Sequence, residues 1–189
     1  YEDLAITREN VFILKSNGTL FSFGFDHITE EEVDSVTEWK GVVPKGEYEA
    51  MSVDPSGNLV VICKKCAGEK NKELVSGYII KAGDSLQAGG SFNIDVAQIK
   101  AISGKVKRGF RPSGLARNPV TGEWFIISSI NKLLVVTDQN WKVTEACQLD
   151  GNMFNQPEGI AFDKQGNLYI SNEGDDLSQG NILKFRRAG

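Results

Sequence analysis

Short apolar segments, each opened by a polar residue, recur along the chain and predict β-strands. Four of them align with one another, at residues 1–6, 48–54, 112–118 and 157–163. Their aligned positions Glu2, Glu49, Ser113 and Glu158 are separated by 47, 64 and 45 residues. A four-stranded propeller blade takes roughly 40 to 50 residues, so this spacing predicts four consecutive blades with an insertion in the second.

A polar turn follows three of these segments and leads into a second strand. The turns cover residues 54–58, 118–122 and 163–167, and the second strands residues 59–63, 123–128 and 168–172. An aspartate or asparagine opens each turn because its side chain can bond the backbone ahead, and a glycine supplies the positive φ. The pattern predicts β-hairpins. Asp163 is expected to serve its turn, because residues 163–167 lack the acidic alternation and final glutamate of a calcium loop.

The remaining strands follow from apolar runs further along each unit. Third strands are expected at residues 19–23, 75–81, 132–137 and 181–185, and outer strands at 36–40, 92–96 and 143–149. The fourth unit has no outer strand. In the insertion, the polar stretch 64–74 predicts a mobile loop, and residues 94–102 predict either a short helix or an outer strand.

The predicted fold class is therefore all-β, a single β-propeller of four-stranded antiparallel blades over residues 1–189. The blade units span about residues 1–47, 48–110, 111–155 and 156–189. A propeller ring is normally closed by strands from both chain ends in one blade, yet Tyr1 opens directly on an inner strand. We therefore expect the C-terminal part of a six-bladed ring, with an exposed blade face near Tyr1 and an unpaired edge at Phe185.

The blade openings and the last unit carry a family resemblance. The aligned openings, together with residues 166–174 and 180–185, resemble the SdiA-regulated (YjiK-like) family of propellers, which is similar to NHL, YWTD and phytase-like propellers. The match runs in order along the whole chain. The resemblance implies a bacterial extracytoplasmic protein, periplasmic, lipoprotein or membrane-associated, with a proposed link to calcium. Ser113 departs from the pattern, because the other three openings carry glutamate.

Charge and composition exclude several classes of protein. The chain has 21 basic and 25 acidic residues and no extended basic tract, so it has no electrostatic footprint for nucleic acid. No apolar run approaches the roughly 18 residues of a transmembrane segment. The cysteine count of three excludes a complete disulfide framework, and Cys63 and Cys147 lie in apolar runs that predict buried packing. His27, the sole histidine, is expected to be exposed.

The candidate site comes from the repeats. Glu2, Glu49, Ser113 and Glu158 are expected at one mouth of the central channel, with the second-strand ends Ser16, Lys64, Ser129 and Glu173 near the opposite side. Carboxylates at Glu2, Glu49 and Glu158 could share a calcium ion; alternatively, each could accept N–H bonds from a neighbouring blade. Secondary candidates are Glu173, Asp175 and Asp176, whose loop is either a ligand set or a solvated connection.

Two functions stay open. The favoured one is a binding or scaffold module for a small ligand or an envelope protein, with no cofactor other than calcium. The alternative is a calcium-dependent phosphoesterase or esterase of phytase-like type. No catalytic residue can be assigned, because the sequence has no Gly-x-Ser-x-Gly nucleophile elbow and too few histidines for a multi-histidine metal site. Trp39, Trp124 and Trp141 are expected to pack within sheets of different blades rather than to form a carbohydrate platform.

Overall fold

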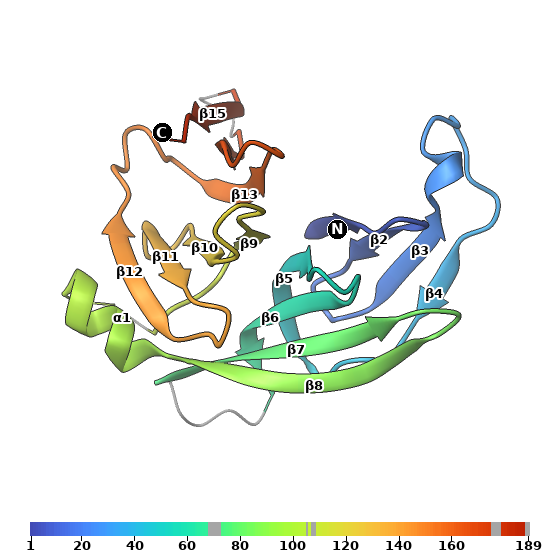
Figure 1. Cartoon of the computed structure of the whole chain (residues 1–189), viewed down its shortest axis with the longest axis horizontal. Helices are drawn as coiled ribbons and strands as arrows, with labels where there is room; N and C mark the ends of the chain where they lie inside the picture. Colours follow the sequence, from blue (N-terminus) through green and yellow to red (C-terminus); the bar gives the residue numbers. More distant parts are fainter. Residues whose placement is uncertain (68–72, 105, 107–108, 175–178, 188–189) are drawn as a thin grey trace. The chain divides into compact units, whose positions relative to one another are not determined.

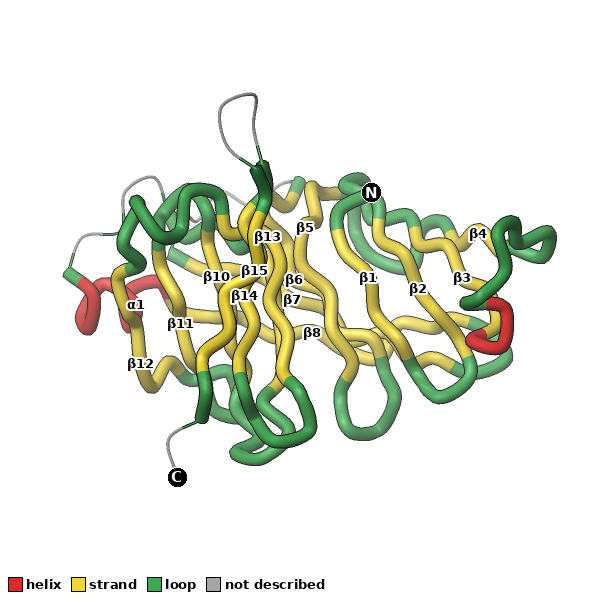
Figure 2. Tube along the Cα trace, turned by 90° about the horizontal axis from the view of Figure 1, so that it is seen from above, coloured by secondary structure: helices red, strands yellow, loops and turns green. Residues whose placement is uncertain are grey.

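The computed structural model describes residues 1–67, 73–104, 106, 109–174 and 179–187. Its strands form four separate antiparallel sheets, which are successive blades of a β-propeller (Figure 1, Figure 2). The predicted fold class and number of blades are confirmed. The chain divides into two compact units, Tyr1–Glu69 with Ser76–Phe92, and Lys70–Val75 with Asn93–Gly189.

The first unit contains the first sheet and most of the second. In the first sheet the strand order is β1-β2-β3-β4, with bounds Asp3–Ile6, Asn10–Leu14, Leu20–Gly24 and Thr37–Trp39. The 3-10 helix η1 (Phe25–His27) follows β3. The second sheet has the order β5-β6-β7-β8, with bounds Gly46–Val53, Leu59–Cys66, Leu74–Ala82 and Leu86–Asp95. The inner strands β1 and β5 are neighbours, as expected for successive blades.

The second unit contains the other two sheets and the helix α1 (Val96–Ser103). The third sheet has the order β12-β11-β10-β9, with bounds Val143–Gln148, Leu133–Thr137, Trp124–Ser128 and Gly114–Arg117. The fourth is three-stranded, β13-β14-β15, with bounds Pro157–Phe162, Leu168–Asn172 and Asn181–Phe185. The inner strands β9 and β13 are neighbours, and α1 packs against β12.

The predicted turns form hairpins. Asp54 Oδ1 accepts hydrogen bonds from the Ser56 and Asn58 backbone N–H groups at 2.8 and 2.9 Å. Asp163 Oδ1 does the same for Gln165 and Asn167, at 3.0 and 2.9 Å. The carboxylates are therefore used to close the turns, as the sequence predicts.

The insertion differs from its prediction in two places and agrees with it in a third. The stretch predicted as a loop is strand at both ends, because Lys64–Cys66 continue β6 and Leu74 begins β7; residues 68–72 lie outside the described residues. The outer strand begins at Leu86 rather than at residue 92. The helical alternative is correct from Val96, where the Asp95 side chain accepts the Ala97 N–H at 2.8 Å and caps α1.

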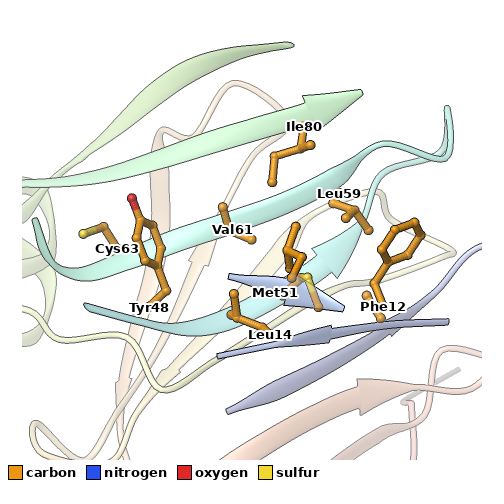
Figure 3. Packing of buried hydrophobic residues seen from close by; sticks show 10 residues of the cluster. Phe12, Leu14, Tyr48, Met51, Leu59, Val61, Cys63 and Ile80 are labelled. Carbon is orange, nitrogen blue, oxygen red and sulfur yellow. The ribbon is translucent and has the colours of Figure 1, made fainter. Parts of the chain in front are cut away.

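A hydrophobic core lies between the two sheets of the first unit. Side chains of β2, β5, β6 and β7 meet there, and Figure 3 shows Phe12, Tyr48, Met51 and Leu59 among them. Burial of each large side chain stabilises the unit by about 1.5–3 kcal/mol. The second unit has its own cluster of Ile127, Leu149, Phe154 and Ile170. The blade motif thus builds its core from alternating inward positions.

The tryptophans and exposed apolar residues add two findings. Trp124 and Trp141 belong to the same blade and stack at 4.9 Å between ring centroids, so the expectation that all three tryptophans lie in different blades is wrong. Both are buried. Leu4 and Ile6 of β1 and Phe185 of β15 are exposed. No helix in the described part of the chain is long and apolar enough to cross a membrane.

Candidate functional site

The two predicted glutamates of the first unit have different surroundings. Glu2 is exposed immediately before β1. Glu49, on β5, is partly buried and forms an ion pair with Lys64 Nζ from the end of β6, while Glu47 lies 3.7 Å from the same nitrogen. An ammonium group therefore already neutralises the Glu49 carboxylate.

Asp3, which is not among the predicted site residues, makes a side-chain contact between the two blades of this unit. Its Oδ2 accepts the Met51 N–H of β5 at 2.7 Å, and its Oδ1 accepts the Leu4 N–H at 2.7 Å. Although part of the side chain reaches solvent, burial raises the Asp3 pKa to about 7, against the opposing effect of the two N–H bonds. Asp3 is thus a carboxyl group that titrates near neutral pH between two blades.

The aligned openings contain a signal for Asp3. One position after the predicted site residues, the other three blades carry Ala50, Gly114 and Gly159. The small residue has a purpose in the second unit: a Cβ added to Gly114 would lie 2.8 Å from the Glu158 carbonyl oxygen. An aspartate at a position where the other three blades have a small residue indicates that this blade contacts its neighbour in a different way.

Ser113 holds the two sheets of the second unit together. Its side chain is buried; Oγ donates to the Pro157 carbonyl oxygen of β13 at 2.8 Å and accepts the Ser129 N–H at 3.0 Å. This contact supports the inter-blade alternative at this position, although the hydroxyl donates to the next blade where a carboxylate would accept.

Two second-strand ends lie beside the blade openings, which corrects the expectation that they face the opposite side. Lys64 reaches Glu49, and the Ser129 N–H reaches Ser113. The reason is geometric: in an antiparallel hairpin the end of the second strand returns to the start of the first.

Glu158 lies on β13 and is partly buried. Its charge acts on Lys132, whose pKa is lowered by burial and raised to a smaller extent by Glu158. Lys132 Nζ also donates to the Asn155 carbonyl oxygen. Glu158 therefore has a cationic neighbour, as Glu49 has.

Of the secondary candidates, only Glu173 can be placed. It is exposed and accepts a hydrogen bond from Gln156 Nε2 at 2.5 Å. Asp175 and Asp176 lie outside the described residues.

The carboxylates fit a calcium ion poorly. A cation at Glu49 has to displace Lys64. Among the described residues, no group of three or more His, Cys, Asp or Glu side chains is arranged to hold a metal ion. Glu2 and Glu49 belong to the first unit and Glu158 to the second, so their shared calcium site stays a prediction.

A cavity of about 940 Å³, not foreseen from the sequence, lies within the first unit. It is lined by the turn between β1 and β2, the turn between β5 and β6, the turn between β7 and β8, and the outer strand β4. Trp39 of β4 lies in its wall and donates Nε1–H to Ser22 Oγ at 2.8 Å. Because its residues come from separate segments and only two of its turns belong to the aligned blade openings, no spacing in the sequence identifies it.

The cysteines differ from their prediction. Cys63 is buried as expected, but it forms a disulfide with Cys66, and Cys147 is exposed rather than buried. Cys147 lies on the outer strand β12, most of whose residues are exposed. Successive side chains of a strand point to opposite faces of its sheet, so an apolar run there does not bury every residue.

Part of the chain matches the model of a known protein family. The family model described as SdiA-regulated matches residues 80–176, which is more than half of the chain. The chain belongs to the SdiA-regulated family. The predicted resemblance is thereby confirmed. A comparison with curated protein sequences finds no match.

Solved structures show the same fold. A protein of unknown function from Bacteroides caccae has a TM-score of 0.60 at 14% identity, over 98% of this chain and 56% of that one. A luciferin-regenerating enzyme has a TM-score of 0.58 at 13% identity, over 96% of this chain and 59% of that one. The β-propeller domain of Myceliophteria thermophila Cps50 has a TM-score of 0.52 at 13% identity, over 96% of this chain and 53% of that one. This member of the SdiA-regulated family thus spans less than two thirds of each of these chains.

Proposed function

We propose that this chain is part of an extracytoplasmic bacterial β-propeller that acts as a binding module, with the cavity of the first unit as its ligand site. The observation that carries the proposal is the cavity itself. Its volume of about 940 Å³ lies within the range of small-molecule sites, about 300–1,000 Å³. Trp39 and other apolar side chains contribute to its wall, and polar side chains from several turns can fix the orientation of a ligand.

The disulfide supports the location outside the cytoplasm. Disulfides form and persist in oxidising compartments and are rare in cytosolic proteins. Thiol labelling in intact cells tests this part of the proposal: a maleimide should modify Cys147, which is exposed, and leave the bonded Cys63 and Cys66 unmodified. Labelling of all three cysteines before reduction would contradict it.

The competing function, a calcium-dependent phosphoesterase at Glu2, Glu49 and Glu158, receives less support because Glu49 is paired with Lys64. Calorimetry with calcium, and hydrolysis assays with phytate and an aryl phosphate, separate the two functions. We expect no turnover with or without calcium. Glu158→Gln should leave the calcium titration unchanged; loss of calcium affinity in this variant would favour the competing function.

A cavity-filling variant tests the binding site. Gly83 lines the cavity, its φ is not positive, and a Cβ there would meet no atom within 4 Å, so Gly83→Phe should fill space without straining the backbone. Gly151→Phe is the matched control, because Gly151 has the same freedom in the second unit. A panel of saccharides, amino acids, polyamines and organic phosphates is titrated against all three proteins. Binding that Gly83→Phe abolishes and Gly151→Phe keeps supports the proposal; binding insensitive to both refutes it.

A further inference from the structure

The turns around the cavity present polar side chains that have no partner among the described residues. Other polar groups of the wall are already engaged: Asp54 closes its own turn, and Ser22 accepts the Trp39 indole N–H. The uncommitted side chains come from three turns and from the first residues of two strands, β2 and β4: Arg8, Glu9, Asn10, Thr37, Ser56 and Asp84. They are available to a ligand.

These groups offer donors and acceptors together. Arg8 can only donate, Glu9 and Asp84 can only accept when ionised, and the amide and hydroxyl groups can do both. Hydroxyl groups of a ligand also donate and accept. A polyhydroxylated ligand therefore matches this set more completely than a ligand of one charge, because an anion would meet the carboxylates and a cation would meet Arg8.

Part of the cavity wall is apolar. Trp39 and Leu86 line it beside Phe12, and Trp39 also packs against the core cluster, which holds its ring in place. An aromatic ring with fixed orientation provides a flat apolar surface next to a polar edge. The C–H face of a sugar ring pairs with such a surface, while its hydroxyls point to the polar rim.

We propose that the ligand of the cavity is a neutral saccharide, with one sugar ring against Trp39 and its hydroxyl groups bonded to Glu9, Asn10 and Asp84. This inference rests on the proposed function and specifies the chemical class of its ligand. It revises the expectation for Trp39: this tryptophan packs in its sheet and also faces a cavity.

The test uses the full chain with defined probes: maltose, cellobiose and chitobiose as neutral saccharides, spermidine as a cation and phytate as an anion. Titration calorimetry up to about 10 mM probe should detect at least one disaccharide and neither charged probe. Asp84→Ala should weaken that binding about tenfold, the effect of one hydrogen bond to a charged group. Asp34→Ala, an exposed aspartate of the same unit outside the cavity, is the matched control and should leave affinity unchanged.

The outcomes separate the two proposals. Spermidine or phytate binding that Gly83→Phe abolishes, without saccharide binding, overturns the saccharide and keeps the cavity as the site. Saccharide binding that Gly83→Phe leaves intact overturns both. Absence of binding for all three disaccharides overturns the saccharide inference. Equal weakening by Asp84→Ala and Asp34→Ala also overturns it, because the contact to Asp84 is then not specific.

Discussion

The two units join their neighbouring inner strands with different chemistry. In the first unit the Asp3 carboxyl accepts the Met51 N–H of the next blade. In the second unit the Ser113 hydroxyl donates to the Pro157 carbonyl oxygen, and Gly114 leaves room for the backbone of β13. One contact contains an ionisable group with a pKa near neutrality and the other does not. The same repeat can therefore form one contact between blades that is sensitive to pH and another that is insensitive.

The largest expected effect is the pH dependence of the first unit. The folded-state pKa of Asp3, about 7, exceeds its ordinary value of 3.8, so protonation stabilises the fold. This contribution is fully present below about pH 3.8 and is lost as the pH rises through about 7, a change on the order of 4 kcal/mol. Urea unfolding of the wild type should show it, and Asp3→Asn should flatten the profile over this range.

Asp163→Asn is the control for that experiment. Hydrogen bonds, first from the Asn167 side chain, lower the Asp163 pKa, so its contribution is present above its unfolded pKa and is lost only as the pH falls through the lower folded value. Its removal should leave the profile between about pH 5 and about pH 8 unchanged. An identical flattening in both variants would mean that Asp3 is not the responsible group.

The next prediction tests the close approach of β9 and β13 at Gly114. Gly114→Val should destabilise the second unit by about 1–3 kcal/mol, because its Cβ would meet the Glu158 carbonyl oxygen, a backbone atom that cannot move aside alone. Hydrogen exchange should increase in β9 and β13 and stay unchanged in β1 and β5. Ala50→Val, at the aligned position of the first unit, serves as comparison. Unchanged exchange in β9 would refute the close approach.

Ser113→Ala removes the polar half of the same contact. The Ser129 N–H and the Pro157 carbonyl oxygen lose their partner, which should cost about 1–2 kcal/mol. Because no group in this contact titrates near neutrality, the loss measured by urea unfolding should be equal at about pH 5 and about pH 8. A loss that varies with pH across this range would break the proposed contrast with Asp3.

The smallest effect concerns His27, which lies on the surface of the first unit. Its hydrogen bond to Glu30, followed by the charge of Asp26, raises the His27 pKa above 6.5. The stabilisation is present below the unfolded pKa and fades as the pH rises through the folded one. NMR titration of this sole histidine should show the raised pKa, which Glu30→Gln and high salt should both reduce. A pKa that neither change reduces would exclude the pair with Glu30.

The blades can be predicted from the sequence. Apolar alternation and the turns opened by Asp54 and Asp163 are local signals, because a hairpin is made by residues close in the chain. The spacing of Glu2, Glu49, Ser113 and Glu158 shows the same local pattern repeated along the chain. The resemblance to the SdiA-regulated family also rests on these repeated segments. The missed disulfide is a partial exception: Cys63 and Cys66 are near in sequence, but whether their sulfurs meet depends on the course of β6.

The contacts of the blade-opening residues depend on tertiary packing. Asp3, Glu49 and Ser113 occupy similar places in their repeats, yet the first bonds a neighbouring backbone, the second pairs with Lys64 and the third bridges two sheets. The cavity is decided in the same way, because turns from separate hairpins line it together with a tryptophan of an outer strand. Contacts between strands far apart in the chain depend on how sheets pack, and periodicity within one strand contains no information about them.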